Sequence, residues 1–295
     1  MTRDLRTRSP FGVKRTAPPV WRATTVGAAG VRLAVFEAGS TSPGAPAVVF
    51  LHGLGHWSEA AWSKLVPHLD PSCRFVAFDL PGFGASEKPD ARYDLPFFTA
   101  TFDAALAELG LDDFALVGHS LGGCIAAHYA GTHPARVRRL ALLAPAGFAH
   151  PARYLVYALA GGWARWAFTR RPSRRFVTGM LRRSVADPKT LDQATIERTF
   201  ELSQDVRVRR AFAGVYAGSI AAFTKRNDVN AGFARYTGPV FCAWGAHDRF
   251  IRIAALREVV RVYPRAQTLV LERSGHLGMV EQPEELGTAL RAFLA

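Results

Sequence analysis

The stretch Leu116-Val117-Gly118-His119-Ser120-Leu121-Gly122-Gly123 is a short apolar run that ends in the pattern G-x-S-x-G. The residues that follow, Cys124 to Ala130, are compatible with a helix. The pattern therefore predicts a tight strand-to-helix turn, with the Ser120 hydroxyl exposed above a sheet and its backbone strained. Gly118 and Gly122 fit such a turn, because a side chain at either position would collide across the bend. The alternative is a serine that caps a helix after an ordinary glycine turn.

Apolar runs alternate with helix-compatible stretches on both sides of this turn. Strands are predicted over 21–26, 31–36, 47–51, 75–79, 137–143, 239–244 and 267–271, besides the run before Ser120. Helices are predicted near 60–69, 97–109, 254–262 and 283–294. This alternation predicts an α/β fold whose sheet is mostly parallel, with an edge hairpin formed by the first two strands. Ligands bind at the carboxyl ends of the strands in such sheets.

The alternation of strands and helices stops between residues 145 and 235. This stretch is helix-compatible and rich in arginine and aromatic residues, and it contains no clear strand. We interpret residues 145–235 as an inserted helical cap, residues 23–144 and 236–295 as the core, and residues 1–22 as a basic tail.

A serine hydroxyl is a poor nucleophile at neutral pH, so catalysis by Ser120 requires a base and a group that orients the base. Asp248 follows the penultimate predicted strand and His276 follows the last one. Both positions are at strand carboxyl ends, on the same edge of the sheet as Ser120. The order Ser120, Asp248, His276 is the order expected for this type of turn. Asp79, after an earlier strand, is a reserve acid that we interpret as a loop anchor, and Asp248 could instead cap a turn.

Five features in this order resemble the cap-bearing serine hydrolases of the α/β-hydrolase superfamily. They are His52-Gly53-Leu54-Gly55, Asp79 to Ser86, Gly118 to Gly123, Asp248 and His276, and the resemblance covers roughly residues 23–295. It implies an eight-stranded, mostly parallel sheet flanked by helices, with an inserted helical cap. It also implies that His276 is the general base and acid, that Asp248 orients it, and that the backbone N–H groups of Leu54 and Leu121 form an oxyanion hole.

Three further residues are candidates for the substrate pocket. The loop His52-Gly53-Leu54-Gly55, which contains Leu54, is called the oxyanion loop below. His52 is expected to brace this loop, and His119 could pack in the core or line the pocket. Trp57 adjoins the oxyanion loop and, together with the aromatic residues of the cap, favours an apolar pocket. Those aromatic residues could equally form the core of the cap itself.

No metal or cofactor is expected from the sequence. His52 and His56 are four residues apart, but the glycines between them indicate a loop and not a metal-binding helical face. Neither the dinucleotide-binding nor the P-loop pattern of glycines is present. The three cysteines, Cys73, Cys124 and Cys242, lie in apolar stretches and are interpreted as reduced thiols.

The net charge of +13 is unevenly distributed. Residues 1–22 carry +5 and residues 145–235 carry +10, so the rest of the chain is near neutral at −2. No basic-aromatic nucleic-acid module is recognisable, and we expect no nucleic-acid partner. The segment from Tyr154 to Arg171 mixes aromatic and basic residues, which favours packing inside the cap, with weak contact to a membrane surface as the alternative.

No run of about 18 uncharged apolar residues is present, and the first ten residues lack the apolar centre of a secretory signal. We therefore expect a cytoplasmic protein. The oligomeric state is left open.

The residues favour a serine hydrolase that cleaves carboxylic esters of small to medium apolar acyl or aromatic groups through an acyl-enzyme on Ser120. One alternative is a carbon–carbon bond hydrolase of the meta-cleavage type, which uses the same three residues. Members of that group more often carry Asn where this chain has His119, which favours the esterase. The other alternative is a non-catalytic ligand receptor or accessory module on the same fold.

Overall fold

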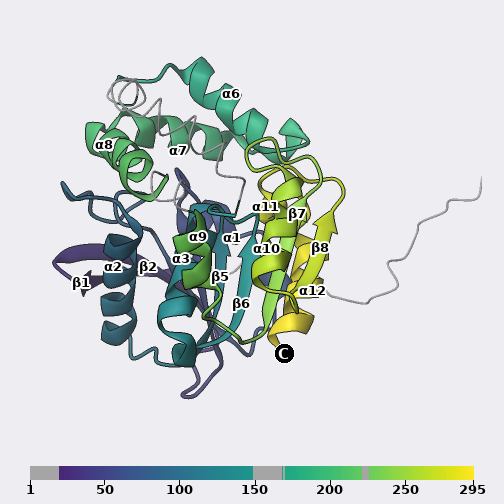
Figure 1. Ribbon diagram of the computed structural model, residues 1–295. Coiled ribbons are helices and arrows are strands. Elements are labelled where there is room, and N and C mark those ends of the chain that lie inside the picture. The colour runs from purple at the N-terminus through teal and green to yellow at the C-terminus, as the bar shows by residue number, and fades with distance from the viewer. Residues whose placement is uncertain (1–19, 149–167, 169, 221–225) are drawn as a thin grey trace, which may run out of the picture.

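The computed structural model describes residues 20–148, 168, 170–220 and 226–295 (Figure 1). Most of the predicted basic tail and the aromatic segment from Tyr154 to Trp166 lie outside the described residues.

An eight-stranded sheet forms the centre of the molecule, in the order β1-β2-β4-β3-β5-β6-β7-β8 (Figure 1). Its strands are β1 (Arg22–Ala28), β2 (Val31–Gly39), β3 (Ala47–Leu51), β4 (Arg74–Phe78), β5 (Phe114–His119), β6 (Val137–Leu143), β7 (Val240–Gly245) and β8 (Gln267–Leu271). Strand β2 pairs antiparallel with β1 and β4, and the other pairs are parallel. The predicted edge hairpin and the mostly parallel sheet are therefore confirmed.

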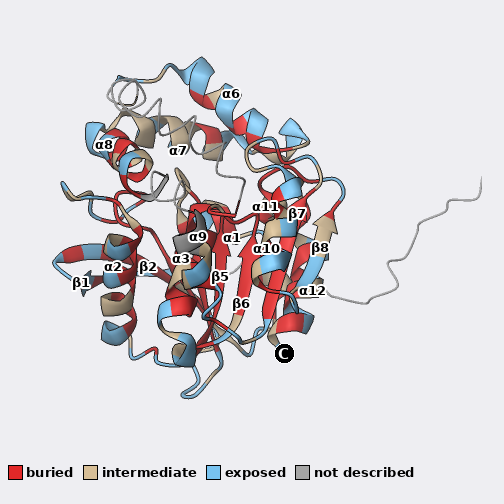
Figure 2. Cartoon of the chain, in the orientation of Figure 1, coloured by how far each residue is buried: buried red, intermediate tan, exposed pale blue. Residues whose placement is uncertain are grey.

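Helices cover both faces of the sheet, as continuous apolar strands require. On one face lie α2 (Leu95–Glu108), α3 (Leu121–Thr132), α9 (Arg226–Phe233) and α10 (Leu256–Val262), which bury their apolar side chains in one core cluster. On the other face lie α1 (Ser58–Trp62), α11 (Gly278–Glu281) and α12 (Pro283–Leu294), which form a second cluster. The central strands are buried throughout between these layers (Figure 2).

The helix expected near 60–69 is shorter than predicted. Helix α1 ends at Trp62, and only a 3₁₀ turn over Val66–His68 continues it. The reason is Pro67, which lacks a backbone N–H and whose ring would collide with the carbonyl group four residues earlier in an α-helix.

In the described part of the interval predicted to be a cap, four α-helices lie between β6 and β7. Three of them, α6 (Arg174–Ser184), α7 (Gln193–Gln204) and α8 (Val206–Val215), lie over the carboxyl ends of the strands (Figure 1). Helix α9 instead packs against α3, so closely that a Cβ atom on Gly131 would stand 2.1 Å from the Gly232 carbonyl oxygen. The described helices include none that combines the length and the apolar character needed to cross a membrane.

Candidate active site

Ser120 lies in the tight turn between β5 and α3 and has a backbone φ of 52° and ψ of −115°. This combination is sparsely populated by residues with a side chain and costs about 1–3 kcal/mol. The two flanking glycines permit the turn. A Cβ atom on Gly118 would stand 2.4 Å from the Gly122 carbonyl oxygen, and one on Gly122 would stand 2.2 Å from that of Leu51.

The strand ends bring Asp248 and His276 together, although they are 28 residues apart in sequence. The His276 Nδ1–H group donates to Asp248 Oδ2 at 2.6 Å, and both side chains are buried. Asp248 Oδ1 accepts from the backbone N–H groups of Phe250 and Ile251 at 2.8 and 2.9 Å. These two bonds hold the carboxylate, so its orientation toward the imidazole is fixed before any substrate binds.

The loop after β3 reaches Ser120. A Cβ atom on Gly53 would stand 2.7 Å from His119 Nδ1 and 3.1 Å from the Ser120 Cβ, so a side chain here would have to displace its neighbours. The next residue is Leu54. Within the described residues, the backbone N–H groups of Leu54 and Leu121 donate to no acceptor. Two free donors beside the serine are what an oxyanion hole requires.

His52 is a buried neutral residue that joins two loops. Its Nδ1–H donates to the Gly53 carbonyl oxygen at 2.8 Å, and its Nε2 accepts from the Leu80 N–H at 2.9 Å. Burial lowers the pKa of His52, and the negative charge of Asp79 only partly opposes this. Asp79 accepts from the Ser58 and Ala85 N–H groups at 2.6 and 2.8 Å, so its carboxylate is used in anchoring loops.

His119 contacts the loop that carries His276. Its Nε2–H donates to the His276 carbonyl oxygen at 2.9 Å, and the two ring centroids are 4.7 Å apart. Its Nδ1 is buried without a partner in the described residues, as is that of His56. Burial first, then the neighbouring His276, lowers the pKa of His119 well below its usual value. Burial, with His52 and His276, lowers the pKa of His56 to about 3.

Several aromatic side chains lie around the oxyanion loop. Phe212 of α8 lies directly over this loop, since a Cβ atom on Gly55 would stand 2.6 Å from its ring. Phe212 contacts Phe83 and Phe168 with ring centroids 5.3 and 5.9 Å apart. Trp57 is half-buried at the start of α1. Other aromatic residues between β6 and β7 have different surroundings. Phe200 packs between α6 and α7, and Phe176 is exposed.

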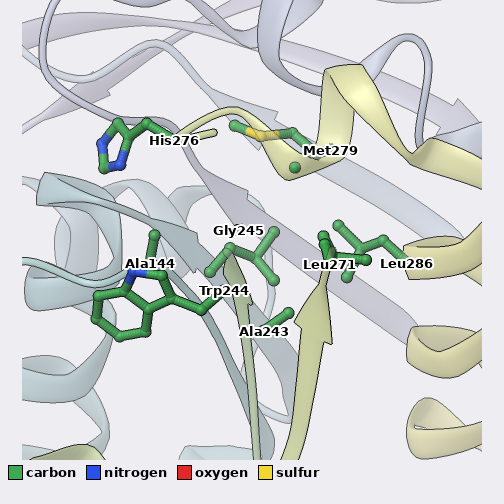
Figure 3. Close-up of a pocket in the computed structure, with 10 residues that line it drawn as sticks. Ala144, Ala243, Trp244, Gly245, Leu271, His276, Met279 and Leu286 are labelled. Carbon is green, nitrogen blue, oxygen red and sulfur yellow. The ribbon is translucent and has the colours of Figure 1, made fainter. Parts of the chain in front are cut away.

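A cavity of about 10 Å³ lies behind His276, between the ends of β7 and β8 and helix α11 (Figure 3). His276 and Met279 lie on one side of it, with Trp244 and Leu271 on the other (Figure 3). Such a volume holds about one water molecule. The cavity is therefore too small for a substrate.

Sequence reasoning did not single out Glu281, although its carboxylate binds the loop that carries His276. Glu281 Oε2 accepts from the Gly275 N–H at 2.7 Å. The available signal was an acidic side chain five residues after His276 in an otherwise apolar turn.

The chain matches a family model described as "alpha/beta hydrolase fold" over residues 46–283. Among curated proteins, it is 28% identical to a 2-hydroxymuconate semialdehyde hydrolase of Pseudomonas sp. (strain CF600), over 91% of this chain and 92% of that protein. It is also 28% identical to the dihydrolipoyllysine-residue acetyltransferase component of an acetoin cleaving system of Pseudomonas putida. That match covers 88% of this chain and only 65% of the component.

Two of the solved structures with a similar fold illustrate the likeness. One is a membrane phospholipase A described as a bacterial virulence factor, with 26% identity and a TM-score of 0.74 over 93% of this chain and 86% of that chain. The other is the 2-hydroxy-6-oxo-6-phenylhexa-2,4-dienoate hydrolase of Rhodococcus sp. strain RHA1, with 23% identity and a TM-score of 0.78 over 93% and 99% of the two chains. At that identity, the second likeness concerns the fold alone.

Proposed function

The chain belongs to the α/β-hydrolase family, and on that premise we propose that it is a serine hydrolase that cleaves carboxylic esters of small to medium apolar acyl or aromatic groups. The observation that carries the proposal is the buried His276–Asp248 pair at 2.6 Å, on the same sheet edge as the strained Ser120 turn. Neither feature is needed for packing alone, since strain and buried polar pairs are both costly.

The proposed reaction has two halves. Ser120 Oγ attacks the ester carbonyl carbon while His276 takes the hydroxyl proton, and Asp248 stabilises the resulting imidazolium. The Leu54 and Leu121 N–H groups stabilise the oxyanion, and the proton passes from His276 to the departing alcohol. In the second half, His276 removes a proton from water as the water oxygen attacks the acyl carbon. The bond between the acyl carbon and Ser120 Oγ then breaks, the acid leaves, and His276 returns the proton to Ser120 Oγ.

The aromatic side chains beside the oxyanion loop support an apolar acyl or aromatic group. Phe212 packs against both Phe83 and Phe168, and Phe168 also contacts Tyr216 with ring centroids 4.8 Å apart. Apolar surfaces next to a few aligned polar groups are typical of small-molecule sites.

A second candidate is hydrolysis of a carbon–carbon bond in a meta-cleavage product. The similarity to the 2-hydroxymuconate semialdehyde hydrolase, over nine tenths of both chains, favours it. The same serine, histidine and aspartate would serve either reaction. The presence of His119 in place of the asparagine more common in that group is the sequence feature that favours the ester.

The test is a screen of p-nitrophenyl esters from acetate to decanoate beside one meta-cleavage product, with wild-type protein and Ser120→Ala. We expect ester turnover that Ser120→Ala lowers by about 10⁴-fold or more, and labelling of wild type alone by a fluorophosphonate. Turnover of the meta-cleavage product alone would establish the second candidate. A protein that turns over neither, resists labelling and gains thermal stability from a ligand would be a receptor.

A further inference from the structure

The loop that carries His276 runs from the end of β8 to α11 without regular structure. Ser274, Gly275 and His276 are nevertheless buried in it. Backbone N–H groups in such a place need acceptors from outside the loop, because water cannot supply them. The acceptors that the loop uses therefore determine where His276 stands.

One acceptor is the carboxylate of Glu281, which joins the loop to the segment that leaves helix α6. Its Oε2 accepts from the Gly275 N–H at 2.7 Å. Its Oε1 accepts from the N–H groups of Ala186 at 2.6 Å and Asp187 at 3.3 Å. A carboxylate suits this position because both of its oxygens accept and neither donates.

The end of α6 also contacts the loop directly. The His276 N–H donates to the Ser184 carbonyl oxygen at 2.7 Å. A Cβ atom on Gly275 would stand 2.8 Å from backbone atoms of Ser184, Val185 and Ala186, so the two backbones touch. With His119 on the carbonyl side of His276, the backbone of the histidine is held from three directions.

Glu281 is half-buried, and burial raises the pKa of its carboxyl group. The N–H bonds from Ala186 and Gly275 lower that pKa again, and nearby Asp187 raises it. An ion in this position is costly and is tolerated because it satisfies several buried donors at once.

We propose that Glu281 is a positioning residue, whose carboxylate ties the His276 loop to the end of helix α6 and thereby sets the position of His276 relative to Ser120. This inference rests on the proposed role of Ser120 and His276, for either class of substrate. It makes the covering helix α6 part of the support of the general base.

The test compares Glu281→Gln with Glu284→Gln, a matched control on an exposed side chain at the start of α12. In Glu281→Gln, the new side-chain amide must turn its NH₂ group toward Gly275 or Ala186, which places donor against donor. We expect Glu281→Gln to lower kcat about 10- to 100-fold, with KM changed less than about twofold. Labelling by a fluorophosphonate should slow by the same factor but still reach every molecule, and the acid midpoint of the kcat/KM profile should move.

Rescue separates positioning from a general loss of structure. In Glu281→Ala, added formate should restore kcat in a saturable manner, because it can occupy the vacated site between the same N–H groups. If Glu281→Gln does not fold, Glu281→Asp takes its place, since a shorter carboxylate reaches only one of the two segments and should slow labelling.

Two outcomes would overturn the inference. In the first, wild type is active and labelled, and both Glu281→Gln and Glu281→Asp match the Glu284→Gln control in rate. In the second, Glu281→Gln loses activity only in proportion to the fraction of molecules that can be labelled, and formate does not restore the activity of Glu281→Ala. A wild type that is neither active nor labelled would instead refute the proposed function itself, and the inference with it.

Discussion

At the scale of single residues, the site depends on backbone placement as much as on side-chain chemistry. Ser120, with a φ of 52°, is one of three residues other than glycine that have a positive φ in the described chain. The turn is kept because β5 and α3 are both packed on the core, so the residue between them has no freedom to relax.

The strain can be measured by replacing Ser120. We expect Ser120→Gly to exceed Ser120→Ala in free energy of unfolding by about 1 kcal/mol, because glycine adopts this conformation without a Cβ clash. Urea denaturation of both variants would measure this difference in the free energy of unfolding, provided that their m values are equal. The control is exposed Ser72, which lacks a positive φ, and there alanine should be the more stable replacement. A less stable glycine variant at position 120 would mean that the turn is unstrained.

At the scale of elements, helix α6 combines an internal and an external role. Val177 and Leu181 face inward against Ile196 of α7. Phe176 and Met180, one turn apart, are 59% and 41% exposed. Arg175, Arg182 and Arg183 are also exposed and pair with no carboxylate in the described part of the chain. Apolar side chains flanked by free arginines suit an anionic membrane surface.

We therefore predict contact between α6 and an anionic membrane surface; the segment from Tyr154 to Arg171, for which the sequence suggested such contact, lies mostly outside the described residues. The protein should sediment with vesicles containing about one third anionic lipid and not with zwitterionic ones, since each arginine near such a surface contributes about fivefold in binding. Binding should weaken when Arg182→Gln is combined with Arg183→Gln, and also when Phe176→Ser is combined with Met180→Ser. The control is Val260→Ser, which replaces an exposed apolar side chain outside α6 and should leave binding unchanged. Equal binding to both vesicle types would refute the prediction, and binding to nucleic acid alone would point to a different polyanion.

At the scale of the whole molecule, stability should depend on pH through three buried or partly buried histidines near the Ser120 turn. His52, His56 and His119 all have a lowered pKa in the folded protein, with burial as the main cause. The unfolded chain takes up these protons near pH 6.5, while the folded protein does not. Their stabilising contribution is thus complete above pH 6.5 and is lost as the pH falls below it.

Between pH 7 and pH 5, His56, whose folded-state pKa is lowered to about 3, should reduce the free energy of unfolding by about 2 kcal/mol, and His119 should act in the same direction. Chemical denaturation at several pH values would measure this change. His119→Gln, whose amide can still donate to the His276 carbonyl group, should reduce the pH dependence by about the contribution of one histidine. An unchanged dependence would mean that His119 is protonated in the folded state.

The amino-acid sequence by itself determined the strand order along the chain, the turn at Ser120 and the edge of the sheet on which the polar residues gather. These follow from local pattern, because strand runs, glycine turns and apolar periodicity act over a few residues. The helix predicted near 60–69 ends early in the structure because Pro67 interrupts the α-helical hydrogen bonds. Only the tertiary structure decided that α9 joins the core, that His119 contacts His276, and that Glu281 joins the His276 loop to α6. Those contacts connect residues up to 157 positions apart, and their geometry depends on how whole elements pack, which no local pattern encodes.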